Sequence, residues 1–102
     1  MKLNFIMRLM KKYALALVIE YQDELVNYID YYIDEGSEVA VSAICDWAED
    51  LPSRSLFQKF IKWIVKEIIK DNKEAIMAIV DEYSDDGAAA IVDRLIYMLK
   101  EA

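Results

Sequence analysis

The sequence predicts an all-α protein: a four-helix bundle built from two similar hairpins, each made of a long helix, a glycine hinge and a short helix. Only two glycines and one proline occur in 102 residues, so β-turns have few places to form. Ile, Leu, Ala, Lys and Glu recur at helical spacing along the chain. A chain of this length can bury one core, so a single domain over residues 1–102 is expected.

The first long helix is expected from about Leu3 to Asp34. Apolar residues keep one face of a 3.6-residue period from Met10 to Tyr32, and no glycine or proline interrupts them. Such a helix would be about 48 Å long, which is more than usual. A kink near residues 20–23 is therefore the alternative to the straight helix, which we prefer.

The short helix of the first hairpin is expected after Gly36. A glycine suits the left-handed conformation that ends a helix, and Ser37 is a suitable cap for the next one. Ala40, Ile44 and Trp47 give this helix an apolar face, and Pro52 stops it. We assign Trp47 and Trp63 to the core.

The second hairpin begins with a helix capped by Ser53 or Ser55. Its apolar stripe passes Asp71, which has capping-box spacing to Glu74, so the segment is either one long helix or two. Gly87, with Asp85 or Asp86 as cap, introduces the last helix. Five tyrosines are expected in the core with their hydroxyls at its rim, namely Tyr13, Tyr28, Tyr32, Tyr83 and Tyr97.

The two halves resemble each other when residue n is placed over residue n + 51. The hinges align best, because Tyr32, Asp34, Glu35 and Gly36 fall on Tyr83, Asp85, Asp86 and Gly87. Either residues 1–51 and 52–102 are an internal repeat, or two similar hairpins arose without common descent. The sequence leaves both readings open.

The charge balance indicates the class of partner. The formal net charge is −7, which opposes direct binding to nucleic acid, because phosphate binding needs clustered Lys and Arg. A basic protein surface is the complementary partner. No apolar run reaches the ~18 to 20 residues of a membrane span, so no membrane partner is expected. The lone Cys45 suits a reducing compartment, and the cytoplasm is the expected location.

Acidic residues dominate one long segment. Residues 13–53 contain no Lys or Arg and ten carboxylates. Like charges three or four residues apart on a helix repel each other, so a docking role that offsets the repulsion is one reading; a solvated face that keeps the chain soluble is the other. A binding site for a partner protein is predicted at Glu20, Asp23, Glu24, Asp30, Tyr31, Asp34, Glu35, Asp81, Asp85 and Asp86.

Catalysis is not expected. The chain has no histidine, and its single cysteine has no partner base. It also lacks the GxSxG elbow and a glycine-rich phosphate loop. We predict no cofactor and no metal site.

The pattern favours a non-catalytic inhibitor or immunity-type protein that mimics nucleic acid and blocks the basic groove of a nuclease or another nucleic-acid-binding protein. Small phage counter-defence proteins share this kind of composition. The alternative is an assembly module, a homodimeric helical bundle whose surplus apolar surface is its interface. In that case the lysines after residue 58, otherwise interpreted as ordinary surface pairing, would contact the acids of a second copy together with Arg8, Lys11 and Lys12.

Overall fold

The computed structural model describes the backbone of residues 2–101 and the side chains of residues 5 and 8–101. Within this part of the chain there are six α-helices, two 3-10 helices and no strand: α1 (Lys2–Glu20), α2 (Gln22–Tyr32), η1 (Ile33–Glu35), α3 (Ser37–Glu49), α4 (Leu56–Asp71), α5 (Lys73–Tyr83), η2 (Ser84–Asp86) and α6 (Ala88–Glu101). The all-α prediction is confirmed. The count differs from the four expected helices because both long helices are divided.

The first division lies at Tyr21, between α1 and α2. Its backbone has φ −109° and ψ 23°, outside the helical range. The indole N–H of Trp47 in α3 donates a hydrogen bond of 3.2 Å to the Tyr21 carbonyl. No proline or glycine stands here, so the only local cause visible is this contact from another helix. The preferred straight helix was wrong, and the break falls inside the region named for the alternative.

The second division lies at Asn72, between α4 and α5. Its backbone has φ −112° and ψ 20°, close to the values at Tyr21. The side-chain amide of Asn72 donates to the Ile68 carbonyl at 2.8 Å. The same carbonyl also accepts the Asn72 backbone N–H at 3.1 Å, so the side-chain bond is a second donor to the last turn of α4 at the position of the break. The segment is therefore two helices, one of the two options that the sequence left open.

Two glycines make the sharp reversals of the chain. Gly36 has φ 107° and ψ 165°, and Gly87 has φ 97° and ψ 167°. Among the described residues only these two have positive φ. Gly36 directly precedes α3, and the start of that helix has no side-chain cap. Ser37 is thus the first helical residue, and its predicted capping role was wrong.

Side-chain capping occurs at the start of α4. The Ser55 hydroxyl accepts a hydrogen bond from the Gln58 backbone N–H at 3.1 Å, and the Gln58 side chain accepts from the Arg54 N–H at 2.8 Å. Ser55, one of the two predicted caps, is therefore confirmed. Asp85 and Asp86 lie within η2, and Gly87 separates them from α6, so neither caps that helix.

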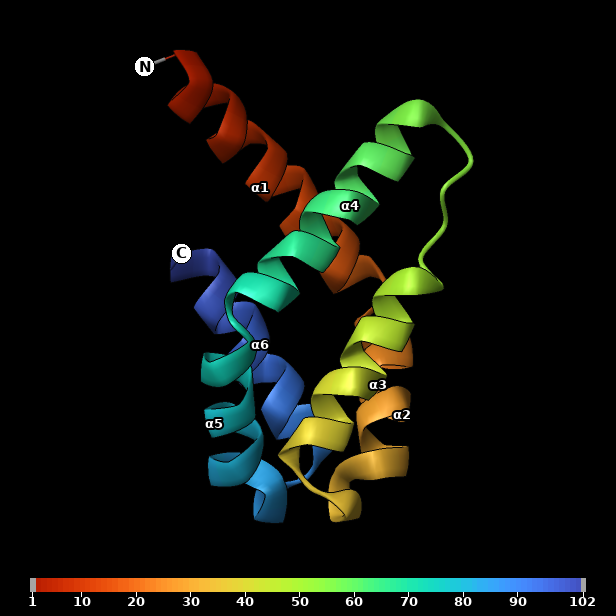
Figure 1. Cartoon of the computed structure of the whole chain (residues 1–102), viewed down its shortest axis with the longest axis vertical. Coiled ribbons are helices and arrows are strands. Elements are labelled where there is room, and N and C mark those ends of the chain that lie inside the picture. The colour runs from red at the N-terminus through yellow and green to blue at the C-terminus, as the bar shows by residue number, and fades with distance from the viewer. Residues whose placement is uncertain (1, 102) are drawn as a thin grey trace.

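The four shorter helices close a ring, because α2 and α5 each contact both α3 and α6. Helices α1 and α4 cross each other at one end of this ring (Figure 1). Both glycine hinges lie at the opposite end of the molecule from the starts of α1 and α4 (Figure 1). The longest dimension is 42 Å.

The core is aliphatic and lies where the helices meet. Ile29, Ala40 and Ile91 are fully buried, and Trp47 is buried as predicted. Trp63, assigned to the core from its spacing, is 54% exposed. Tyr13 and Tyr97 are also exposed, and Tyr83 is half-buried. The expectation for Trp63, Tyr13 and Tyr97 was wrong, because helical spacing identifies an apolar face but does not show whether another helix covers it.

The halves of the fold match at an offset of 51 residues. The bounds of α2 and η1 map onto those of α5 and η2, and α3 and α6 begin at equivalent positions. The contacts match too, since α2 with α6 corresponds to α5 with α3, and α1 with α6 corresponds to α4 with α3. This geometry describes two similar halves. Their common ancestry stays a prediction.

The hinges allow a test of the backbone. We expect Gly36→Ala and Gly87→Ala each to lower the free energy of unfolding by about 1 to 3 kcal/mol, because positive φ with extended ψ is open almost only to glycine. No atom lies within 4 Å of an added Cβ at either position, so the loss comes from backbone strain and not from a clash.

Urea unfolding at unchanged m measures the loss. Ser37→Ala, one residue after the first hinge, is the control and should change stability by less than about 0.5 kcal/mol. Two alanine variants as stable as the parent chain would contradict the hinge geometry.

Candidate protein-docking site

The predicted docking residues lie on α2, η1 and their counterparts in the second half. Asp30 is on the last turns of α2, and Asp34 and Glu35 are in η1. At the offset of 51 residues these positions become Asp81, Asp85 and Asp86, on α5 and η2. Both 3-10 helices lie beside the hinges, at one end of the long axis (Figure 1). The fold thus brings six carboxylates to one end, which we call the acidic end.

The remaining predicted acids lie further along the first half. Glu20 ends α1, and Asp23 and Glu24 form the first turn of α2. Acids in a first turn interact favourably with the positive end of the helix dipole. These three carboxylates lie around the junction of α1 and α2, and they are not among the six carboxylates of the acidic end. All nine predicted carboxylates are exposed.

Internal neutralisation of the acids is slight. Among the described side chains the one ion pair joins Lys66 of α4 to Glu49 of α3. The Tyr28 hydroxyl donates a hydrogen bond to the Asp50 carboxylate. Glu49 and Asp50 both lie outside the predicted site, so these two contacts leave the acidic end untouched.

Tyr31 is the one predicted site residue that is not an acid. Its side chain is 79% exposed, and its ring packs edge-to-face on Tyr32 with a centroid distance of 4.8 Å. Contact with Tyr32 limits the freedom of the Tyr31 ring while leaving most of it open. Tyrosines of this kind are frequent at binding hot spots, because they add rigid area and a hydroxyl.

The contacts at the far end of α3 shift two pKa values. The hydrogen bond to Asp50 raises the pKa of Tyr28, because the anionic phenolate could not donate it. The hydrogen bond from Lys66 lowers the pKa of Glu49. Both groups are at the surface, so the contacts orient α2 and α4 against α3 with little effect on stability.

Cys45 has the properties of a packing residue. It is half-buried and packs against the core. Burial raises the pKa of its thiol, which lowers the fraction of reactive thiolate. No group of three or more Cys, Asp or Glu residues in the described part of the chain is placed to hold a metal ion.

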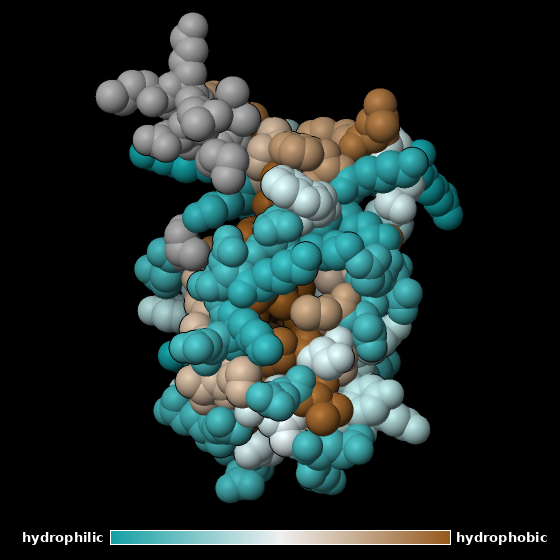
Figure 2. All heavy atoms as spheres, in the orientation of Figure 1, coloured by the Kyte–Doolittle hydropathy of each residue, from teal (hydrophilic) through white to brown (hydrophobic). Residues whose placement is uncertain are grey.

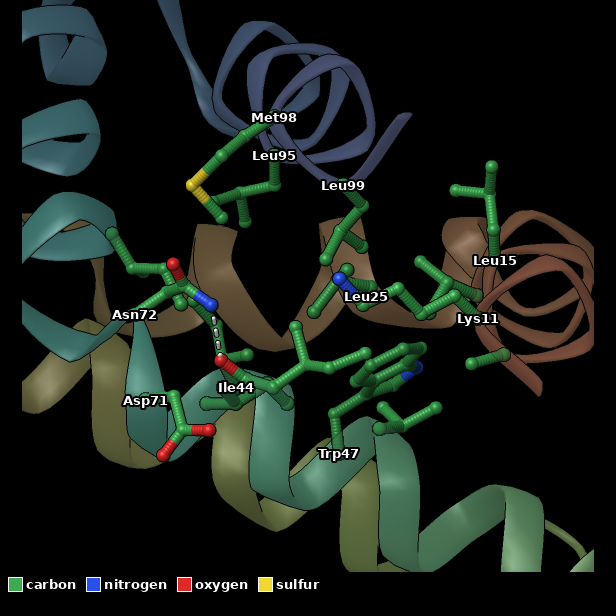
Figure 3. A pocket seen from close by; sticks show the side chains of 16 residues that line it. Lys11, Leu15, Leu25, Ile44, Trp47, Asp71, Asn72, Leu95, Met98 and Leu99 are labelled. Atoms are coloured by element: carbon green, nitrogen blue, oxygen red, sulfur yellow. Dashed lines mark hydrogen bonds between the residues drawn. The ribbon is translucent and has the colours of Figure 1, made fainter. Parts of the chain in front are cut away.

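A cavity of about 140 Å³ lies away from the acidic end, between the crossing helices and the ring. Apolar side chains from α1, α3, α4 and α6 line most of it. Figure 3 shows Trp47 and Leu15 on one side, and Asp71 and Asn72 on the other. The Asn72 amide is already bonded to the Ile68 carbonyl. The cavity is small and predominantly apolar, and is no docking surface for a protein.

Comparisons with protein-family models, with curated proteins and with solved structures find no match to this chain.

Over the residues that the structure describes, no helix combines the length and the apolar character that crossing a bilayer requires.

One group of exposed residues was missed by the sequence analysis. Several aromatic side chains of α1 and α4 lie uncovered, among them Phe57, Phe60 and Trp63. The signal that could have indicated them is the absence of any acid in residues 51–66, a property that this segment shares with residues 1–19.

The contact between Tyr28 and Asp50 predicts a pH effect. Tyr28 should titrate above the usual phenol pKa of about 10, and Asp50→Asn should bring its pKa down. Because the folded-state pKa is raised, the contribution of this contact to stability is complete below the unfolded-state value and is lost as the pH rises through the folded-state value. NMR titration of labelled tyrosine measures both pKa values. An unchanged Tyr28 titration in the Asp50→Asn protein would show that the bond is absent.

Proposed function

We propose that this chain is a non-catalytic inhibitor or immunity-type protein. It docks its acidic end on the basic groove of a nucleic-acid-handling protein and so excludes the nucleic acid. The carboxylates stand for phosphates, and Tyr31 anchors the contact. The observation that carries the proposal is that the nine carboxylates of the site are exposed and take part in no ion pair among the described side chains.

Electrostatics explain how such a surface would act. Exposed charges of one sign attract an oppositely charged groove at long range and raise the rate of association. Asp30 and Asp81 occupy equivalent positions in the two halves of the chain, and so do Asp34 and Asp85. The acidic end therefore carries two equivalent groups of charge. A groove that follows a nucleic-acid backbone presents basic side chains at several points, which suits an extended anionic surface.

The proposal is tested by charge reversal. Asp30→Lys with Asp34→Lys should weaken capture of a basic partner from lysate of the source organism by about tenfold or more, because close charge pairs at interfaces couple strongly. The salt dependence of capture should fall with it. Added duplex DNA or RNA should release the partner from the unmodified chain.

The matched control reverses two acids on α6 instead. Asp93→Lys with Glu101→Lys changes the net charge equally, and both positions are exposed and outside the site. Capture by this control should resemble that of the parent chain. If both double variants capture the partner as the parent chain does, docking through the acidic end is wrong.

The homodimeric assembly module remains the alternative, favoured by the exposed aromatic side chains of α1 and α4. Light scattering at low and high salt separates the two functions. We expect a monomer, because the uncovered apolar side chains lie among bases that would repel each other across a two-fold interface. A dimer that persists at high salt would support the assembly module.

A further inference from the structure

The end of the molecule opposite the hinges exposes most of the large apolar side chains that are uncovered. Of the eleven such side chains in the described part of the chain, seven belong to the first two thirds of α1 and the first half of α4: Phe5, Leu9, Tyr13, Leu56, Phe57, Phe60 and Trp63. Leu56 is 84% exposed. Figure 2 shows apolar atoms gathered at this end, where α4 begins. We call these seven side chains the apolar patch.

The patch is continuous across the two helices. Phe5, Leu9 and Tyr13 are spaced four residues apart, so they share one side of α1. Leu56, Phe60 and Trp63 share one side of α4 for the same reason. Tyr13 and Phe57 join the helices through an edge-to-face contact with a centroid distance of 5.3 Å. The Phe60 and Trp63 rings stack at 6.0 Å, which extends the patch along α4.

The charged residues of the two helical segments that carry the patch are all basic, and among the described side chains only Lys66 is paired with an acid, Glu49 of α3. Residues 2–19 and 51–66 contain eight Lys and Arg residues and no Asp or Glu. Arg8, Lys11, Lys12 and Lys59 are exposed, and Lys62 is half-buried. Long basic side chains can lay their methylene groups beside apolar surface and keep the charge outside. An apolar patch with a basic rim is therefore built for an occupant that is both apolar and anionic.

A second copy of the chain does not meet this requirement. Two patches facing each other would bring two sets of bases together without an acid between them. Contact of the patch with the acidic end of another copy would satisfy the charges. The acidic end, however, offers little apolar surface, with Tyr31 and Val39 as its nearest large exposed apolar side chains. The apolar patch would then stay mostly uncovered.

Single-stranded nucleic acid fits less well than lipid. It binds proteins by stacking bases on open aromatic rings beside basic side chains. Here the Phe60 and Trp63 rings stack on each other, and Phe57 meets Tyr13. The side chains of Leu9 and Leu56 are aliphatic and offer no ring on which a base could stack. Aliphatic side chains mixed with Phe, Trp and Lys are instead typical of helices that lie in the interface of a membrane.

We propose that the apolar patch and its basic rim bind the surface of an anionic phospholipid bilayer. Phe5, Leu56 and Trp63 enter the boundary between headgroups and acyl chains, and the bases contact the lipid phosphates and carboxylates. This differs from the expectation of no membrane partner, which followed from the lack of a spanning segment. The bilayer surface needs no such segment, and the acidic end faces away from it.

Vesicle flotation tests the proposal with defined probes. The full chain should bind phosphatidylcholine vesicles that contain about one-third phosphatidylserine at least about tenfold more tightly than pure phosphatidylcholine vesicles. Lys12→Glu with Lys59→Glu should weaken binding to the anionic vesicles by about tenfold or more. The control, Lys73→Glu with Lys100→Glu, makes the same change of net charge at exposed positions outside the patch and should bind within about threefold of the parent chain.

The apolar contribution has its own pair of variants. Phe57→Ser with Trp63→Ser should weaken vesicle binding by about tenfold. Val39→Ser with Tyr97→Ser, two exposed positions elsewhere, should not. Brominated lipids should quench Trp63 fluorescence, and Trp63→Phe should remove that quenching because Trp47 is buried. Circular dichroism checks that each variant keeps its helices.

Equal binding to both kinds of vesicle, or none to either, would overturn the proposal. A chain that does not bind vesicles but forms concentration-dependent dimers, which the Phe57→Ser, Trp63→Ser variant no longer forms, would also overturn it. A preference for single-stranded oligonucleotides over anionic vesicles would do the same. Asp30→Lys with Asp34→Lys should leave vesicle binding intact. Failure of the acidic docking function and failure of membrane binding can therefore be distinguished.

Discussion

The arrangement of this molecule depends on two glycines whose backbone combines positive φ with an extended ψ. At Gly36 and Gly87 the chain turns back after a 3-10 helix and starts a new α-helix at once. The aliphatic faces of α2, α3, α5 and α6 can then close on one core. The same reversals leave η1 and η2, with their acids, outside the core at one end. The position of the charges is thus a consequence of the backbone at two residues.

The helical period of the apolar residues and the positions of glycine, proline and serine were enough to predict the fold class, both hinges and the burial of Trp47. They also limited the cap of α4 to Ser53 or Ser55. They left the break at Tyr21 as the less favoured alternative to a straight helix, because no helix-breaking residue stands there and the contact from Trp47 is made across 26 residues of sequence. Asn72 was a better signal, since its amide can bond to its own helix. Trp63 was assigned to the core because the period of a helix carries no information on where the neighbouring helix ends.

The candidate site shows a similar division. Exposure of the acids could be predicted from their density alone, whereas their collection at one end required the topology of both halves. The lysines of α4 were interpreted as ordinary surface pairing. In the structure Lys66 pairs with Glu49 of another helix, and no ion pair forms within α4 among the described side chains. What matters for this segment is the absence of acids and not the spacing of its bases.

The opposite charges at the two ends give the protein a permanent electric dipole along its 42 Å axis. A dipole of this kind experiences a torque near any charged surface, and so the molecule turns before it touches. This torque acts over a distance of roughly 8 to 10 Å from the surface, because salt at physiological ionic strength screens the electric field beyond that distance. A single protein of this shape can therefore present different ends to surfaces of different sign without changing its conformation.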